Sequence, residues 1–407
     1  MFEIKGTYAS AKIYTDDIEE EAVSQIMNLL NQPFARDSSP RFMPDVHAGK
    51  GCTIGTTMKI NDCTCPNLVG VDIGCGMLVV ELRERIDDFR KLDEIIHTSV
   101  PAGMEIHEKI QTDFPIENLK CFKKLRNPDY LKRSVGSLGG GNHFIEIDES
   151  KDGRHFLIIH TGSRNLGKQV CEIYMKIAQE NMKYGQNELN KACDELIRTY
   201  KAEGKERQID SALKALKQEF RDKYASSEKD LAVIQGIDLE NYLHDMKLCQ
   251  EYAVKNRETI ADIILKNYFS LSLEDFESWH CIHNYIDVEN RILRKGSISA
   301  QKDEPVIVPL NMRDGCIIGK GKSNPEWNYS GPHGAGRKMS RAKAKANLSV
   351  SSFEESMKGI YSSTVNESTL DEAPDAYKNA DEIIENISET IEVIEIIKPV
   401  YNFKASE

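Results

Sequence analysis

The sequence lacks the features that would place the protein in a membrane or outside the cell. None of its 407 residues belongs to an apolar run of about 18, so we expect no membrane span. The opening MFEIKGTYASAKIYTDD has no basic segment followed by an apolar one, so we expect no signal peptide. The ten cysteines include no CxxC pair. Without a secretion signal they favour a reduced, cytoplasmic protein in which cysteines bind metal or fill the core.

The common nucleotide-binding fingerprints are absent as well. GKS at 321–323 resembles the end of a phosphate-binding loop, but Cys316 stands where that loop needs glycine. GCGMLV at 74–79 begins like a dinucleotide fingerprint and then ends in Val79. Neither segment therefore predicts a P-loop or a Rossmann site.

The overall charge excludes a surface built broadly for nucleic acid. The formal net charge is -12, so any phosphate-binding site must be a local basic patch. Hydrophobic residues make up 40% of the chain, and the mean hydropathy is -0.48. These values are typical of a globular protein with a sizeable core.

Three zones follow one another along the chain. Residues 1 to about 165 alternate short β-branched runs with glycine turns, which predicts strands with functional loops at their ends. Residues about 168 to 268 are glycine-poor, charged and periodic at helical spacing. From about 278, glycines and short apolar runs return, and the final segment predicts a helix and then a strand. We therefore predict one α/β catalytic domain over 1–407, interrupted by a helical insertion at about 168–268. Residues about 175 to 265 should form long helices that pack away from the candidate metal site described below.

Side chains that can bind metal recur beside glycines. Each alone has an ordinary structural role: a turn cap, a buried small residue or a hydrogen-bonded histidine. Together they form one carboxylate, one thiol and three imidazoles, namely Asp72, Cys75, His143, His160 and His283. This mixed set favours a borderline divalent metal over Ca²⁺ or Mg²⁺. Five ligands exceed what one catalytic ion takes, which predicts two metals with the thiolate between them.

The stretch WNYSGPHGAGRKMSR places His333 in a glycine-rich turn with Arg337 four residues later. A core histidine does not need cations around it, whereas a histidine that meets a phosphate does. The following charges, among them Arg341 and Lys345, lie on a predicted helix. They are typical of a solvated helix face, but their position directly after His333 favours an anion site.

Several long motifs, in order, resemble the RtcB family of RNA ligases. They are MPDVHAGKGCTIG, VGVDIGCGM, GGGNHFIEI, HTGSRNLG, HNYID and PHGAGRKMSR. The resemblance runs from Pro44 to about Lys404. It implies the unusual α/β fold of that family, two Mn²⁺ ions and GTP. It also implies joining of RNA ends that carry a 2′,3′-cyclic phosphate or 3′-phosphate to 5′-hydroxyl ends, in RNA repair or tRNA splicing.

The resemblance also implies a role for individual residues. His333 matches the histidine that becomes guanylylated, and Arg164 and Arg337 match arginines needed for activity. Cys75 matches the thiolate that the two manganese ions share. The implied GTP contacts are Asn142, His143, Glu146, His283, Asn284, Asn311, His333, Gly334, Ala335, Gly336 and Lys404. Archease is the activating partner that the resemblance suggests.

The implied reaction passes GMP from His333 to the RNA 3′-phosphate and gives an RNA-(3′)pp(5′)G end, which the 5′-hydroxyl attacks. One departure from the family pattern is PLNMRDG, where Asn311 replaces a serine, and it suggests a divergent branch that repairs RNA. Two other classes stay open. One is a binuclear metal-dependent phosphoesterase with water as nucleophile; the other is a non-catalytic relative that binds RNA or metal.

Overall fold

The computed structural model describes residues 1–49, 51–224 and 228–405. Within these ranges the strands are β1 (Phe2–Lys5), β2 (Ser10–Ile13), β3 (Arg41–His47), β4 (Ile54–Lys59), β5 (Cys63–Thr64), β6 (Gly76–Glu81), β7 (Phe144–Glu149), β8 (His155–Thr161), β9 (Ile234–Gln235), β10 (Glu277–Ile282), β11 (Asn284–Asp287), β12 (Ile292–Lys295), β13 (Ser297–Ser299), β14 (Pro305–Asn311), β15 (Gly315–Gly321), β16 (Ser330–Pro332) and β17 (Ile391–Lys404). The α-helices are α1 (Glu20–Leu30), α2 (Phe89–Ser99), α3 (Pro128–Arg133), α4 (Arg164–Ala202), α5 (Ile209–Tyr224), α6 (Gly236–Phe269), α7 (Arg341–Asn347), α8 (Val350–Ser356) and α9 (Ala380–Ile387). None of the described helices is both long and apolar enough to cross a bilayer.

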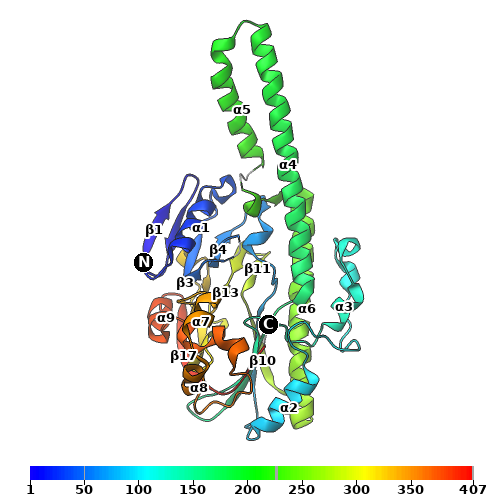
Figure 1. Ribbon diagram of the computed structural model, residues 1–407, viewed down its shortest axis with the longest axis vertical. Coiled ribbons are helices and arrows are strands. Elements are labelled where there is room, and N and C mark those ends of the chain that lie inside the picture. The colour runs from blue at the N-terminus through cyan, green and yellow to red at the C-terminus, as the bar shows by residue number, and fades with distance from the viewer. Residues whose placement is uncertain (50, 225–227, 406–407) are drawn as a thin grey trace.

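Two larger sheets organise the body of the molecule (Figure 1). One has six strands in the order β1-β2-β3-β4-β12-β11, and the other has seven in the order β10-β6-β8-β7-β17-β15-β14. The strand pairs β13-β16 and β5-β9 complete the described sheets. The α/β fold class predicted from the sequence is confirmed.

The seven-stranded sheet is apolar on both faces. Leu78 and Val80 of β6 pack with α2 and α6, while Met77 and Val79 face the opposite side with residues of β14 and α9. Side chains alternate between the faces of a strand, so a strand buried on both sides reads as a continuous apolar run. This explains why MLVVEL carries no polar alternation.

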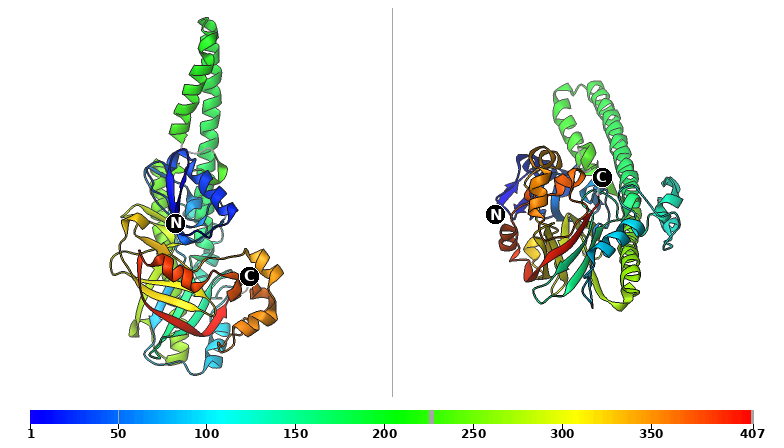
Figure 2. Two further views of the ribbon diagram at one scale, coloured as in Figure 1. Left: turned by 90° about the vertical axis from the view of Figure 1, so that its left-hand side faces the viewer. Right: turned by 60° about the horizontal axis from the view of Figure 1, so that its bottom comes forward.

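The predicted helical zone consists of α4, α5 and α6, and it begins at Arg164, four residues before the predicted start. The first half of α4 is buried against α6, β9 and the turn Pro66–Leu68, and its last buried residue is Gly185. Beyond it, α4 and α5 form an antiparallel pair that projects from the body (Figures 1 and 2).

The expectation that the helices of residues about 175 to 265 pack away from the metal site is wrong for α6. Arg257 is fully buried and donates to the carbonyls of Gly74 at 2.9 Å and Thr161 at 2.7 Å. The neighbouring Asn256 donates to Gly162 O at 3.1 Å. Helix α6 thus supports the loops around Asp72, Cys75 and Arg164, because their carbonyls need buried donors. The status of residues 168–268 as an insertion stays a prediction.

Because α6 is buried in the body and α5 projects from it, variants in the two helices should change the unfolding free energy by different amounts. Arg257→Ala removes the donor of two buried carbonyls and should lower the apparent unfolding free energy by about 3 kcal/mol. The double variant Lys214→Ala/Lys217→Ala changes exposed side chains of α5 and should alter it by no more than about 0.5 kcal/mol. Urea unfolding followed by circular dichroism measures both values. Equal losses in the two variants would contradict the supporting role of Arg257.

Candidate active site

The five predicted metal ligands meet at one end of the seven-stranded sheet. Cys75 precedes β6, His143 precedes β7, and His283 follows β10. In the strand register, Gly76 lies opposite Thr161 and Ile282, and Phe144 lies opposite His160. Adjacent antiparallel strands therefore bring residues far apart in sequence to the same sheet edge.

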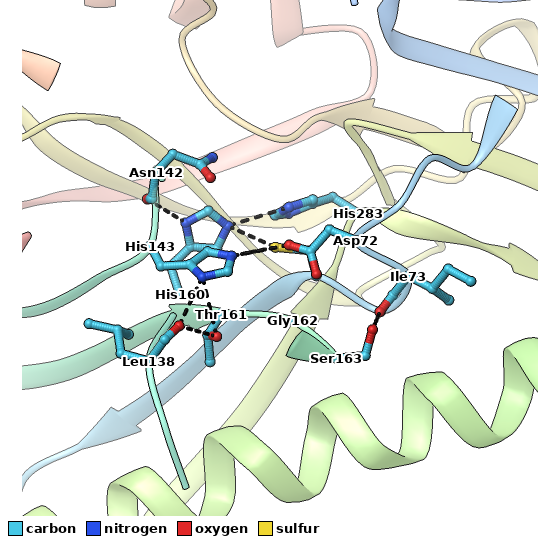
Figure 3. Close-up of polar contacts among 12 residues, drawn as sticks. Asp72, Ile73, Leu138, Asn142, His143, His160, Thr161, Gly162, Ser163 and His283 are labelled. Carbon is cyan, nitrogen blue, oxygen red and sulfur yellow. Dashed lines mark hydrogen bonds and ion pairs between the residues drawn. The ribbon is translucent and has the colours of Figure 1, made fainter. Parts of the chain in front are cut away.

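The side chains form two groups that share the thiol of Cys75. Asp72, His143, His160 and His283 point toward one another (Figure 3). One group contains Cys75, His160 and His283, and the other contains Asp72, Cys75 and His143. The Cys75 sulfur lies 3.4 Å from His160 Nε2 and 3.6 Å from His143 Nε2. Asp72 Oδ2 lies 3.1 Å from His143 Nε2. The two groups of potential ligands thus share one sulfur, while the number of bound metals stays a prediction.

The histidine hydrogen bonds leave lone pairs for a cation. His143 Nδ1 lies 2.9 Å from Leu138 O, and His160 Nδ1 lies 3.1 Å from Asn142 O. A ring nitrogen facing a carbonyl must be the donor, so Nε2 of each ring is the acceptor. His160 Nε2 faces His283 Nε2 at 3.4 Å. Such inward lone pairs, with outward N–H groups held by carbonyls, fit a bound divalent metal.

Burial sets the protonation of these ligands. It lowers the pKa of His160 and His283 well below the usual value, and neighbouring imidazoles add to the effect. Burial, with the charge of Asp72, raises the pKa of the Cys75 thiol well above its usual range. Burial acts to raise the pKa of Asp72 too, but the hydrogen bond and charge of His143 outweigh it and lower the pKa. The imidazoles are therefore ready ligands, while the thiol loses its proton on metal binding.

Gly162 allows the carboxylate of Asp72 to reach the cluster. A Cβ atom at this position would lie 2.1 Å from Asp72 Oδ1. Any other residue at 162 would therefore displace the carboxylate. The glycine in HTGSRNLG is required by this contact.

A pocket lies beside the metal-ligand cluster, the name used below for Asp72, Cys75, His143, His160 and His283. His160 belongs to both the cluster and the pocket lining. Its walls come from the ends of β7, β14 and β17 and from the turn after β16. The lining residues are His47, Ile54, Asn142, Phe144, Glu146, His160, Pro309, Leu310, Asn311, Met312, His333, Gly334, Ala335, Gly336, Arg337, Arg341, Tyr377, Asn402 and Lys404. Most of the predicted GTP contacts are thus brought together, including Asn311 and Lys404.

His143, His283, Asn284 and Arg164 do not line this pocket. His143 and His283 lie in the adjacent metal-ligand cluster. Asn284 Oδ1 instead accepts from Gly296 N at 2.8 Å. Arg164 begins α4 with a φ of 55° and donates to Ser137 Oγ at 3.0 Å and Gly103 O at 2.8 Å. Burial lowers its pKa.

Asp45 orients His333, a role that its position in MPDVHAGKG did not predict. Its Oδ2 lies 2.6 Å from His333 Nδ1 and accepts the backbone N–H of His333 at 3.1 Å. The His333 ring centroid is 4.8 Å from that of His283, so His333 stands between the pocket and the metal ligands. Gly336, with φ of 75°, would place a Cβ 2.8 Å from Asp45 Cα. Its glycine is needed for this approach.

Glu372 is a second residue that no sequence signal identified. It is 2% exposed and lies 3.3 Å from Arg337, 2.7 Å from Arg341 and 2.8 Å from Lys404. Burial acts to raise its pKa, but the charges of Lys404, Arg341 and Arg337 hold the pKa at about 2. Asp371 also pairs with Arg341. The three cations thus line one side of the pocket, which suits an anionic ligand.

The chain matches the family model described as "tRNA-splicing ligase RtcB" over residues 25–127 and 117–405. It is 29% identical to the "RNA-splicing ligase RtcB" of Escherichia coli (strain K12) over 422 residues, covering 96% of each chain. It is 25% identical to the "tRNA-splicing ligase RtcB" of Nanoarchaeum equitans over 466 residues, covering 93% of this chain and 90% of the relative. A site with a shared thiol and a glycine-flanked histidine thus lies in a protein similar to nucleic-acid ligases. The chain belongs to the RtcB family.

The shared thiol predicts the consequence of its removal. Cys75→Ser replaces a soft ligand common to both groups by a neutral hydroxyl, so at least one bound divalent ion should be lost. The matched control is Cys281→Ser, since Cys281 is also buried but lies outside both groups. Elemental analysis after loading with Mn²⁺ measures the content. Full metal content in Cys75→Ser would contradict the bridging role.

Proposed function

We propose that this protein is an RNA ligase that joins 2′,3′-cyclic phosphate or 3′-phosphate ends to 5′-hydroxyl ends through a guanylylated His333. The observation that carries the proposal is the position of His333, held by Asp45 between a cationic pocket and the metal-ligand cluster. RNA ends and GTP are the proposed substrates. The names of its relatives refer to RNA and tRNA splicing, and the family match supports the reaction class.

His333 is the proposed nucleophile. Asp45 accepts the Nδ1 proton, so Nε2 keeps its lone pair and can attack the α-phosphate of GTP as pyrophosphate leaves. The ring becomes cationic in the phosphoramidate, and the buried carboxylate of Asp45 stabilises that charge. A 2′,3′-cyclic phosphate end is first opened by water to a 3′-phosphate. GMP then passes from His333 to the 3′-phosphate, which frees the histidine, and attack of the 5′-hydroxyl on the activated RNA phosphate expels GMP.

The pocket side chains have complementary roles in this proposal. Arg337 and Lys404 offset phosphate charge, while Asn142 and Glu146 contact the guanylate. Asn311 contributes from the end of β14. Arg164 lies outside the pocket, and its proposed role is to contact the RNA end beside the metal-ligand cluster. Its guanidinium lies close to His143, since a Cβ on Gly139 would meet both side chains.

Asp72, Cys75, His143, His160 and His283 would hold two Mn²⁺ ions. Bound there, the ions would neutralise charge on the attacked phosphate. The mixed ligands and the shared sulfur fit borderline divalent ions of this kind. Activation by archease, a cytoplasmic location and action in RNA repair remain predictions that rest on the family resemblance and on the sequence.

The first test is covalent labelling. Given Mn²⁺ and GTP labelled in the α-phosphate, the protein should acquire label that survives denaturation, is labile to acid and is stable to alkali. His333→Ala should abolish it, while Cys281→Ser serves as a control that keeps the site. Label that persists in His333→Ala would move the nucleophile elsewhere, and label from ATP in preference to GTP would overturn the guanine assignment.

A binuclear phosphoesterase is the second candidate, because the metal-ligand cluster alone can activate a water. This reading leaves the Asp45–His333 pair without a covalent role. Metal-dependent phosphoester cleavage without label from any nucleotide would favour it over the ligase.

Asp45→Asn tests the orientation of the nucleophile. An amide cannot stabilise the imidazolium as a carboxylate does, so the single-turnover rate of guanylylation should fall by about 10²- to 10⁴-fold. Asp62→Asn, which changes an exposed carboxylate near the same sheet, should leave the rate unchanged. Rapid-quench labelling measures both rates. An unchanged rate in Asp45→Asn would show that His333 does not depend on this contact.

A further inference from the structure

Two carboxyl groups lie side by side beneath the pocket. Glu146 and Asp148 are two residues apart on β7, so their side chains leave the same face of the strand. Glu146 is 3% exposed and lines the pocket, whereas Asp148 is 0% exposed and lies deeper. Cys316 of β15 closes the group, and ligand atoms of all three residues lie within 4.8 Å of one another.

The described residues supply Asp148 with no hydrogen-bond donor stronger than the thiol of Cys316. Neither of its buried oxygen atoms has a partner, while Glu146 accepts from the side-chain amide of Asn402. The sulfur of Cys316 lies 3.8 Å from Glu146 Oε1. A buried carboxylate without a donor is costly, and two adjacent carboxylates are more so. The Glu146–Asp148 pair must therefore carry a proton or hold a cation.

The nearby cations are committed elsewhere. Lys404 contacts Glu372 at 2.8 Å and Asn142 O at 3.2 Å. Lys398 donates to Asp314 O at 3.0 Å. On the other side of β7, the residue opposite Asp148 is the apolar Phe156 of β8. A proton on one of the two carboxyl groups is the simplest way to remove the repulsion.

We propose that Asp148 is a neutral carboxylic acid that donates its proton to Glu146, which keeps Glu146 as the anion facing the pocket. Burial raises the pKa of Asp148 well above its usual range, and the charge of Glu146 adds to the effect. Burial also raises the pKa of Glu146, but Asn402 and Lys404 act in the opposite direction. The proton therefore belongs to the deeper group.

The consequence for substrate choice rests on the proposed function. A guanine edge presents two N–H donors, and one carboxylate can accept both, whereas adenine presents a ring acceptor at the corresponding position. Asp148 would thus be a positioning residue for nucleotide specificity. It acts by holding Glu146 ionised and oriented, without touching the nucleotide.

Infrared spectroscopy tests the proton independently of nucleotide chemistry. The wild-type protein near pH 8 should show a C=O stretch of a buried protonated carboxyl that Asp148→Asn lacks. Glu277→Gln, an exposed carboxylate of the same sheet, should retain the band. Absence of the band in wild type overturns the proposal. A tightly bound metal ion that is lost from both Asp148→Asn and Cys316→Ser would also overturn it, since a cation would then replace the proton.

Nucleotide transfer tests the consequence. Asp148→Asn keeps an N–H donor toward Glu146 and should retain the wild-type preference for GTP over ATP within about twofold. Asp148→Ala removes that donor and should reduce the preference about tenfold, the cost of one hydrogen bond to a charged group. A loss in Asp148→Asn equal to that in Asp148→Ala overturns the positioning role. If no variant, nor the wild type, takes label from GTP, the proposed function fails while the infrared result still decides the protonation of Asp148.

Discussion

The burial of several candidate metal ligands around one thiol is the constraint on which the rest of the site depends. His160 Nε2 is an acceptor that lies 3.4 Å from both His283 Nε2 and the Cys75 sulfur, away from water. The carbonyls of Leu138 and Asn142 hold two of the three rings in this tautomer. Arg257 of α6 fixes the backbone on both sides of the cluster. The strand ends, the loops that join them and helix α6 thus hold one buried cluster of candidate metal ligands in place.

The pocket beside the cluster has a charge balance of its own. Glu372 is an internal counterion for Arg337, Arg341 and Lys404, so three buried or half-buried cations are held in place without bound phosphate. Preformed cations lose little reorganisation energy when an anion arrives, which favours tight and oriented binding. The same pocket contains Glu146, a carboxylate that would repel phosphate. The pocket therefore has a cationic side and an anionic side, a polarity that suits a nucleotide with its base at one end and its phosphates at the other.

The acidic overall charge and the projecting helices are general properties of the molecule that are distinct from its candidate active site. A net charge of -12 coexists with a cationic pocket because the compensating groups are local and buried. The helices α4 and α5 extend the molecule far beyond the body (Figure 1). Among the described residues, none in these two helices belongs to the metal-ligand cluster. The first half of α4 and most of α6 belong to the core of the body.

The sequence by itself determined the fold class, the helical zone and the five candidate metal ligands that the structure brings together. Apolar runs, helical periodicity and glycine-flanked polar residues are local signals, and each is written within a few adjacent positions. It could not determine which groups Asp45, Arg257, Glu372 and Asp148 would contact. Asp45 meets His333 across 288 positions, and Glu372 meets Lys404 at the end of the chain. These contacts come from sheet register and helix packing, which only the tertiary structure decides, because burial and the proximity of charge have no signature in a single stretch of sequence.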